Sequence, residues 1–230
     1  METVDAAIAG HLPLSGIRTY KPRRGRVTPR QAAALGIDDG LLLPTPSQAL
    51  DLTTVFGSRP VICEIGFGTG APTVALAQQD PATGILAIDV HTPGIGDLLW
   101  RLRAAGLHHV RVIEADALHV LRTAITPGSL AGIRTYFPDP WPKARHHKRR
   151  LVSATNASLM ASRVASGGSW HLATDWTDYA EHAMEVLDAD PAWIGGPIRR
   201  PEWRPVTRYE QLALDQGREV TDLWYTKMGP

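Results

Sequence analysis

An aspartate held between two prolines is the residue of this chain best suited to chemistry. Asp139 lies in the run Phe-Pro-Asp-Pro-Trp-Pro-Lys at residues 137–143. Proline fixes φ, lacks an amide donor and pushes the preceding residue toward an extended conformation, so the backbone of Asp139 is restrained from both sides. Such a loop presents one carboxylate and the ring of Trp141 in a fixed pose, which indicates a site for a substrate.

Two acid-free basic segments belong to a chain that is otherwise acidic. The formal net charge is only +1, yet residues 18–31 and 143–150 contain eleven of the 24 Lys and Arg residues. These basic residues are Arg18, Lys21, Arg23, Arg24, Arg26 and Arg30 in the first segment, and Lys143, Arg145, Lys148, Arg149 and Arg150 in the second. Basic runs are often plain solvated surface, but the second adjoins Asp139. We therefore expect both segments to contact a polyanion.

The elements that position these residues follow from an alternation of apolar runs and helical patterns. Predicted strands cover residues 61–65, 84–90, 110–114, 133–137, 169–173 and 222–228, and predicted helices cover residues 47–56, 72–79, 95–105, 117–125, 152–165 and 176–187. This alternation predicts an α/β fold in which helices cover both faces of a parallel sheet. We expect residues 1–45 to form a basic, weakly structured arm and residues 46–230 to form one domain.

A glycine-rich loop follows the first strand of the predicted sheet. Residues 64–70 read Glu-Ile-Gly-Phe-Gly-Thr-Gly, and Gly66, Gly68 and Gly70 allow a sharp turn and a close approach of the backbone to a ligand. With Ala71 the spacing also fits a dinucleotide fingerprint, so the glycines alone do not exclude NAD. The charge of Glu64 favours a cationic ligand, such as S-adenosylmethionine, over a pyrophosphate.

Further carboxylates follow the next strands, at the sheet edge where ligands bind in folds of this type. Asp89 ends the second strand and could accept hydrogen bonds from both ribose hydroxyls of either cofactor. Asp116 could meet an adenine amino group or cap the helix that follows it, and one carboxylate could do both. Asp175 follows the strand at residues 169–173 and is either a helix cap or a substrate contact.

Several features of the sequence bear on the cellular compartment. The first residues lack the basic and long apolar regions of a secretory signal, and the apolar runs are too short for a membrane span. Cys63 is the only cysteine, so an intramolecular disulfide is impossible. We expect a reduced, cytoplasmic protein without a membrane partner.

The sequence resembles the bacterial tRNA (guanine-N7)-methyltransferases. The resemblance rests on residues 64–70, 89–94, 137–146, 174–175 and 204–210, the last reading Arg-Pro-Val-Thr-Arg-Tyr-Glu. The first stretch is shared by a whole enzyme class, whereas the run around Asp139 and the late Thr-Arg-Tyr-Glu are specific. The chain departs from the family pattern at Asp89, where members usually have Glu, and at Pro142, where many have a basic residue or histidine.

The resemblance implies a Rossmann-like, doubly wound and mostly parallel sheet with an antiparallel C-terminal strand. It implies S-adenosylmethionine as cofactor, tRNA as partner and no metal, while the oligomeric state is left open. The cofactor would be bound by Glu64, Gly66, Gly68, Gly70, Asp89, Asp116 and Asp139, with Asp139 also catalytic. The tRNA would be contacted by Lys143, Asp175, Thr207, Arg208, Tyr209 and Glu210.

The chemistry implied by this resemblance needs no general base. Guanine N7 carries an in-plane lone pair and no proton, so catalysis consists of alignment and of accommodating the positive charge that develops. Asp139, Asp175 and Glu210 are candidates for the guanine edge, and Trp141 either stacks on an extruded base or packs under its loop. Other readings are methylation of another base, an NAD-dependent oxidoreductase and a pure RNA-binding module. Cytosine C5 methylation would need a thiol near Asp139, and Cys63 lies in the first strand.

Overall fold

The sheet of the protein has eight strands and is mostly parallel. In the computed structural model, which describes residues 17–21 and 25–229, the strand order is β1-β4-β3-β2-β5-β6-β8-β7. The strands are β1 (Leu42–Leu43), β2 (Val61–Ile65), β3 (Gly84–Asp89), β4 (Val110–Glu114), β5 (Leu130–Tyr136), β6 (Val164–Thr174), β7 (Trp193–Ile198) and β8 (Thr221–Lys227). All neighbours from β1 to β6 pair in parallel, and β8 runs antiparallel between β6 and β7. The predicted doubly wound sheet with an antiparallel C-terminal strand is confirmed.

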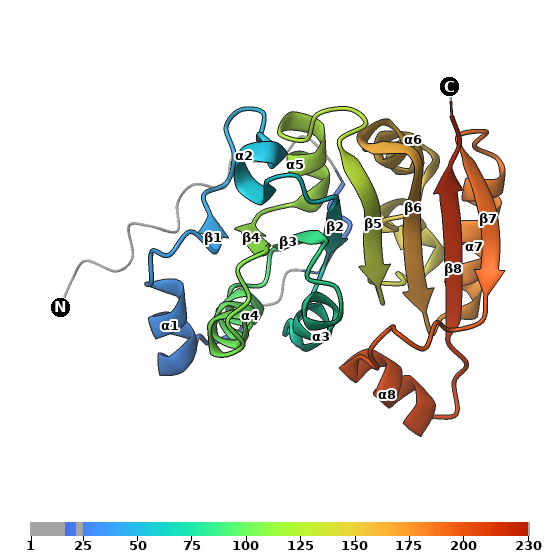
Figure 1. Ribbon diagram of the computed structural model, residues 1–230. Helices are drawn as coiled ribbons and strands as arrows, with labels where there is room; N and C mark the ends of the chain where they lie inside the picture. The colour runs from blue at the N-terminus through green and yellow to red at the C-terminus, as the bar shows by residue number, and fades with distance from the viewer. Residues whose placement is uncertain (1–16, 22–24, 230) are drawn as a thin grey trace.

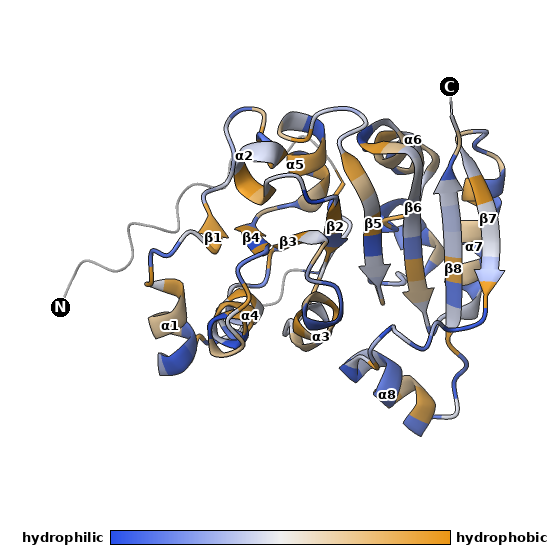
Figure 2. Ribbon diagram, viewed as in Figure 1, coloured by the Kyte–Doolittle hydropathy of each residue, from blue (hydrophilic) through white to orange (hydrophobic). Residues whose placement is uncertain are grey.

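Helices cover both faces of this sheet (Figure 1). They are α1 (Pro29–Leu35), α2 (Leu52–Phe56), α3 (Ala71–Gln79), α4 (Thr92–Ala104), α5 (Ala117–Thr123), α6 (Ala154–Arg163), α7 (Thr177–Asp188) and α8 (Arg208–Asp215), with a 3-10 helix at Ala144–Arg149. One apolar cluster joins the sheet to α2, α5, α6 and α7, and a second joins it to α1, α3 and α4. Figure 2 shows β1, β4 and β2 as strongly apolar, whereas β6 and β8 are paler.

The chain order places a crevice at the middle of the sheet. From β2 the chain builds outward through β3 and β4, and then returns to add β5 on the other side of β2. At such a reversal the loops that follow neighbouring strands diverge, and ligands bind in the gap. Glu64 and Asp89 lie at the carboxyl ends of β2 and β3, and Asp116 and Asp139 lie in the loops that follow β4 and β5.

The N-terminal segment contains more structure than the sequence indicates. Thr28 accepts a hydrogen bond from the backbone N–H of Gln31, and the Gln31 side chain accepts one from the backbone N–H of Thr28. This capping box fixes the start of α1, and β1 then pairs with β4. The expectation of weak structure is therefore wrong for 29–35 and 42–43. The predicted contacts of Arg23 and Arg24 lie outside the described residues.

Two elements near the C-terminus were not predicted, and one predicted helix is shorter than expected. The helix predicted at 47–56 begins only at Leu52, because Asp51 caps it by accepting hydrogen bonds from the amides of Thr53 and Thr54. The unpredicted elements are the edge strand β7 and the helix α8. In the part of the chain that the structure describes, no helix has the length and apolar character needed to cross a bilayer.

Candidate functional site

A cavity lies at the carboxyl ends of the central strands. It encloses about 910 Å³ of empty space, including the open solvent at its mouth. Its wall includes Gly66 and Gly68, the carboxylates of Asp89, Asp116 and Asp139, and the ring of Tyr209. The structure thus brings together residues that are up to 143 positions apart in sequence.

The glycine loop adopts a backbone conformation that ordinary residues avoid. Gly66, Gly68 and Gly70 all have positive φ, at 77°, 62° and 72°. A Cβ atom at Gly66 or Gly68 would meet no described atom within 4 Å, whereas at Gly70 it would lie 2.6 Å from the side chain of Leu98. The first two glycines therefore keep space open at the cavity, and Gly70 permits close packing of the loop on α4.

Asp89 is built into the floor of the cavity. Its carboxylate accepts hydrogen bonds from the backbone N–H groups of Gly68 (3.0 Å), Val90 (2.7 Å) and His91 (3.0 Å). Burial nevertheless raises the pKa of Asp89, against the opposing effect of these amides. Oδ1 accepts the bonds from Val90 and His91, whereas Oδ2 accepts only the bond from Gly68 and keeps a second lone pair for a ligand.

Glu64 is the least satisfied charge near the cavity. Its side chain is buried, and its Oε2 atom has no hydrogen-bond partner among the described residues. Burial raises the pKa of Glu64 to about 7, while Arg134 acts in the opposite direction. Glu64 does not itself reach the cavity wall, but the next residues, Ile65 and Gly66, do. A buried carboxylate with an unpaired oxygen costs free energy unless a donor or cation arrives.

Asp116 caps its helix and also lies on the wall of the cavity. It caps α5 by accepting a hydrogen bond from the backbone N–H of His119 at 3.1 Å, and it lines the cavity. Tyr20 also lines the cavity, and its pKa is raised by burial and by the nearby charge of Asp116.

The loop around Asp139 is strained on both sides of the carboxylate. Phe137 and Trp141 have φ values of 53° and 46°, and no other described residue except glycine has a positive φ. Left-handed conformations of this kind cost about 1–2 kcal/mol each in non-glycine residues. The side chain of Arg150 holds the loop by donating from Nε to the carbonyl of Pro140 at 3.1 Å. Strain maintained in this way is typical of functional loops.

The N-terminal segment reaches this loop from the far end of the sequence. The backbone N–H of Lys21 donates a hydrogen bond of 2.7 Å to Oδ2 of Asp139, and the indole N–H of Trp141 donates to the carbonyl of Thr19 at 3.1 Å. Residues 19–21 also line the cavity. The arm therefore contributes directly to the site.

Trp141 packs under its loop, and this resolves the two alternatives for its ring. It is only 6% exposed, and the ammonium of Lys21 and the guanidinium of Arg149 lie 5.4 and 5.1 Å from the ring centroid. A ring with so little exposed surface does not stack on a base.

The second basic segment divides into exposed and buried cations. Lys143, Arg145 and Lys148 are exposed on the 3-10 helix or beside it, where they can meet phosphates. Arg150 is 2% exposed and forms an ion pair with Asp178, so its expected phosphate contact is wrong. In the first segment, Arg30 forms an ion pair with Asp97 at 2.8 Å.

A pair of aromatic rings forms part of the cavity wall. The rings of Phe137 and Tyr209 are near-parallel, with a centroid distance of 6.4 Å and an interplanar angle of 25°. Tyr209 is 38% exposed, and both rings line the cavity. They provide an accessible aromatic surface for stacking, which the sequence had suggested for Trp141.

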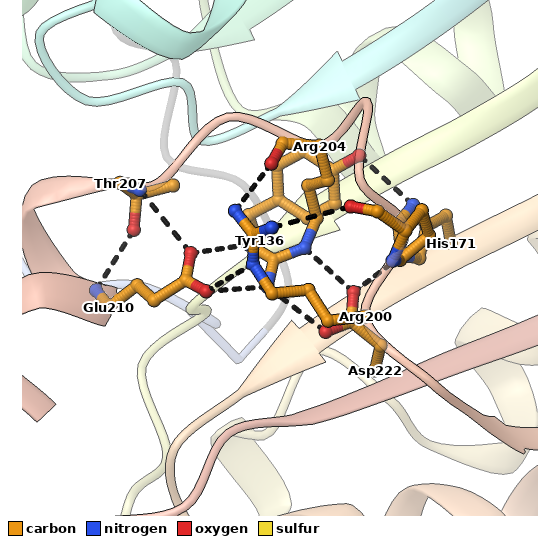
Figure 3. A network of polar contacts seen from close by, with 8 residues as sticks. Tyr136, His171, Arg200, Arg204, Thr207, Glu210 and Asp222 are labelled. Atoms are coloured by element: carbon orange, nitrogen blue, oxygen red, sulfur yellow. Dashed lines mark hydrogen bonds and ion pairs between the residues drawn. The ribbon is translucent and has the colours of Figure 1, made fainter. Parts of the chain in front are cut away.

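Seven residues implied by the resemblance do not line the cavity, namely Glu64, Gly70, Lys143, Asp175, Thr207, Arg208 and Glu210. Three of these are engaged within the protein. Thr207 caps α8 by accepting from the N–H of Glu210 at 3.0 Å, and the Glu210 carboxylate is 2% exposed and paired with Arg204. Asp175 forms an ion pair with Arg218, and it does not cap α7, whose N-cap is Trp176. Figure 3 shows Thr207 and Glu210 turned toward a cluster of buried charges.

Sequence reasoning missed most of the residues in that cluster. Tyr136, His171, Arg200, Arg204 and Asp222 are joined by hydrogen bonds and ion pairs around Glu210. The signal in the sequence was a polar side chain inside apolar strands, at His171 in β6 and Asp222 in β8. A buried polar group needs a partner, but its partner lies 18 to 51 residues away.

Comparisons with known proteins agree on the kind of protein. The family model described as "Putative methyltransferase" matches residues 58–223. Two relatives are each named tRNA (guanine-N(7)-)-methyltransferase. One, from Streptomyces avermitilis, is 48% identical over 93% of this chain and 76% of its own length, and one from Nitrosospira multiformis is 44% identical over 94% and 97%.

Solved structures with the same fold are more distant in sequence. The 16S rRNA methyltransferase KamB aligns with a TM-score of 0.58 and 15% identity, over 80% of this chain and 96% of its own. The putative methyltransferase SMU.1697c from Streptococcus mutans, solved in complex with SAH, aligns with a TM-score of 0.50 and 11% identity, over 77% and 93%. These two likenesses concern the fold, whereas the sequence relatives and the matched family model identify the lineage. The chain belongs to the tRNA (guanine-N(7)-)-methyltransferase family.

Proposed function

We propose that this protein transfers the methyl group of S-adenosylmethionine to N7 of a guanosine in tRNA. The observation that carries the proposal is the position of Asp139. It projects from a strained, proline-bounded loop onto the wall of the same cavity as the glycine loop and Asp89. A cofactor lying along the glycine loop would meet a substrate base beside this carboxylate.

The residues of the cavity fit a cationic nucleoside cofactor. The unpartnered, buried oxygen of Glu64 attracts positive charge, and pyrophosphate would be repelled by it. Oδ2 of Asp89 has a lone pair left for a ribose hydroxyl, and Asp116 has one carboxylate oxygen outside its capping bond for an adenine amino group. When bound, S-adenosylmethionine supplies an electrophilic methyl group on a sulfonium.

The residues of this chain then have to align the base and accommodate its charge. N7 needs no deprotonation, so no general base is required. Asp139 accepts hydrogen bonds in the structure, from Lys21 N–H, and in the complex it would accept them from the N1–H and amino edge of guanine. The negative charge of the same carboxylate stabilises the positive charge that develops on the purine as the methyl group is transferred.

The substrate contacts expected from the resemblance divide into direct and supporting residues. Lys143, Arg208 and Tyr209 are exposed, so we assign the two cations to tRNA phosphates and the Tyr209 ring, with Phe137, to the base. Asp175, Thr207 and Glu210 are engaged within the protein, and we assign them to holding Tyr209 in place. The variable loop of tRNA is the position implied by the resemblance.

The main alternative reactions are less compatible with the site. Burial raises the pKa of the Cys63 thiol to about 12, and its side chain is fully enclosed, which does not suit a cytosine C5 nucleophile. An NAD-dependent reaction would place a pyrophosphate near Glu64. The lone buried thiol also suits the reducing cytoplasm, the compartment we infer for this protein.

The test is identification of the product nucleoside. The full-length protein is incubated with bulk tRNA and methyl-labelled S-adenosylmethionine, and the tRNA is digested to nucleosides. We expect the label in 7-methylguanosine, and its loss when the guanosine of the variable loop is replaced by adenosine in a single purified tRNA. Label in another nucleoside, or none in the presence of intact binding of S-adenosylmethionine, would overturn the proposal.

A further inference from the structure

A buried network of charges connects the carboxyl end of β5 to the start of α8 (Figure 3). Arg204 is at its centre. Its guanidinium forms two hydrogen bonds to Glu210, at 2.7 and 2.9 Å, and one to Oδ2 of Asp222 at 3.0 Å. Arg200 donates a further bond of 2.6 Å to Glu210. Arg204, Glu210 and Asp222 are each at most 2% exposed, so water does not substitute for these contacts.

The network continues from Asp222 to the cavity wall. Nε2 of His171 lies 2.7 Å from Oδ1 of Asp222, and Nδ1 of His171 lies 3.0 Å from the hydroxyl oxygen of Tyr136. Burial lowers the pKa of His171, although Asp222 acts to raise it. A neutral imidazole can donate a hydrogen bond from Nε2 to Asp222 and accept one at Nδ1 from the Tyr136 hydroxyl. This arrangement satisfies the imidazole, the carboxylate and the hydroxyl. Two arginines and two carboxylates then balance, which a buried cluster requires.

Both ends of the network lead to the aromatic pair at the cavity. Tyr136 immediately precedes Phe137, and Glu210 immediately follows Tyr209. The rings of Phe137 and Tyr209 form a near-parallel pair on the cavity wall. The guanidinium of Arg204 also lies over the ring of Tyr136, 5.6 Å from its centroid. The separation of the two rings therefore depends on the charges behind them.

A second ion pair holds the other end of α8. Arg218, just beyond the helix, pairs with Asp175 at the end of β6. The helix packs few apolar groups, since Leu212 and Leu214 are 42% and 51% exposed and only Glu210 and Ala213 are buried. In a helix with so little apolar burial, polar anchors at its two ends set its position.

Building on the proposed function, we propose that Arg204, Glu210, Asp222, His171 and the Tyr136 hydroxyl form a positioning relay that sets the gap between Phe137 and Tyr209 for the substrate base. Glu210 and Thr207 then act through Tyr209 and do not themselves contact the guanine. This assigns to the late Thr-Arg-Tyr-Glu motif one contact residue of the base, Tyr209, and a support behind it.

A double-mutant cycle on the full-length protein tests the relay. The variants are Glu210→Gln, Tyr209→Ala and their combination, with the single-turnover rate measured at saturating tRNA and S-adenosylmethionine. If Glu210 acts only through Tyr209, each single variant slows the reaction about tenfold and the double variant slows it no further, because without the Tyr209 ring Glu210 has nothing left to position. Independent contacts would multiply to about a hundredfold, and that result would overturn the proposal.

A milder pair of variants keeps the test decisive should Glu210→Gln fail to fold. Tyr136→Phe removes only the hydroxyl that joins the relay to the cavity, and we expect it to be non-additive with Tyr209→Ala. The matched control is Tyr225→Phe, whose hydroxyl donates to Asp188 at 2.6 Å on the opposite face of β8. The control should leave the rate unchanged; equal rate losses for Tyr136→Phe and Tyr225→Phe would contradict the relay.

Hydrogen exchange in α8 gives a readout that separates this inference from the proposed function. Tyr136→Phe should speed amide exchange at residues 208–215 several-fold, whereas Tyr225→Phe should not. If wild-type protein forms 7-methylguanosine while the cycle is multiplicative and exchange is unchanged, the relay is wrong and the function stands. If no 7-methylguanosine forms, the proposed function fails, although the exchange result still reports on the anchoring of α8.

Discussion

The two sides of the cavity treat buried carboxylates in opposite ways. On the side of β2, Glu64 is buried with one oxygen lacking any partner among the described residues. On the side of α8, Glu210 is equally buried but receives three hydrogen bonds from Arg200 and Arg204. The two residues have the same side chain and nearly the same burial. They differ in that arginines donate hydrogen bonds directly to Glu210, whereas Arg134 acts on Glu64 only as a nearby charge.

This difference separates a binding group from a supporting group. A buried charge that the protein itself neutralises gains little by interacting with a ligand. Its role is to hold the surrounding structure rigid. A buried charge that the protein leaves unpaired destabilises the free protein and gains when a cation arrives. The pairing state of a carboxylate therefore indicates its role better than its presence in a motif does.

Asp139 stands between these two sides and gives the largest expected effect. We expect Asp139→Asn to lower the single-turnover rate of methyl transfer by about 100- to 1,000-fold, the usual effect of removing a group that stabilises developing charge. Affinity for S-adenosylmethionine should change much less. An exposed carboxylate on α7, Glu181, provides the control, and Glu181→Gln should be silent. If Asp139→Asn kept most of its rate at saturating tRNA, the carboxylate would not be catalytic.

Exchanging each buried glutamate for glutamine gives effects of opposite sign on stability. Glu64→Gln should raise the free energy of unfolding of the cofactor-free protein by about 1–2 kcal/mol above neutral pH, because it removes an unpaired buried charge. It should also weaken S-adenosylmethionine binding by about 10- to 100-fold. Glu210→Gln should lower the free energy of unfolding by about 3 kcal/mol, since it leaves buried guanidinium groups underpaired. Denaturant unfolding and calorimetry measure these quantities.

The pH dependence of stability sharpens the same comparison. The pKa of Glu64 is raised from 4.5 to about 7 on folding, so the folded protein binds more protons than the unfolded chain between these values. Its stability should therefore fall, relative to that of Glu64→Gln, as the pH rises from 5 to 7.5, and then level off. Saturating S-adenosylmethionine should reduce this difference. A difference that does not vary with pH would show that Glu64 is already paired.

Removal of the N-terminal arm gives the smallest expected effect on activity, because among the described residues of the arm only Thr19 and Lys21 form hydrogen bonds to the loop around Asp139. Deleting residues 1–21 removes the hydrogen bonds to Asp139 and Trp141 but keeps the capping box of α1. We expect KM for tRNA to rise several-fold and its dependence on salt to flatten, since phosphate contacts produce that dependence. Lys143→Ala, with a single cation removed, should flatten it less. An unchanged salt slope after the deletion would separate the arm from tRNA binding.

The fold was predictable where burial alone determines structure. The strands predicted at 61–65 and 110–114 match β2 and β4 to the residue, because central parallel strands are buried on both faces and are rich in Val and Ile. The edge strand β7 was missed, since its sequence Trp-Ile-Gly-Gly-Pro-Ile contains glycine and proline and is largely exposed. The short helix α8 was missed because polar anchors, not an apolar face, hold it.

The site was predictable only in part, for a related reason. The strand-end rule placed Asp89, Asp116 and Asp139 at one cavity. The sequence does not show which charges neutralise each other, however. From the sequence, Arg150 is one more cation of a basic segment, but in the structure it is paired with Asp178. The sequence likewise does not show that the Glu210 carboxylate is paired with Arg204. These partners come from separate segments, so only the folded chain identifies them.

The left-handed residues beside Asp139 have a consequence for engineering this protein. Phe137 and Trp141 occupy backbone conformations that glycine would adopt without strain. Selection for thermal resistance alone would therefore find gains in this loop, through substitutions that let the backbone relax. Relaxation would also release the pose of the carboxylate between them. We expect the most heat-resistant variants of residues 137–141 to be among the slowest methyltransferases. Thermal stability and turnover would then trade off within this one loop.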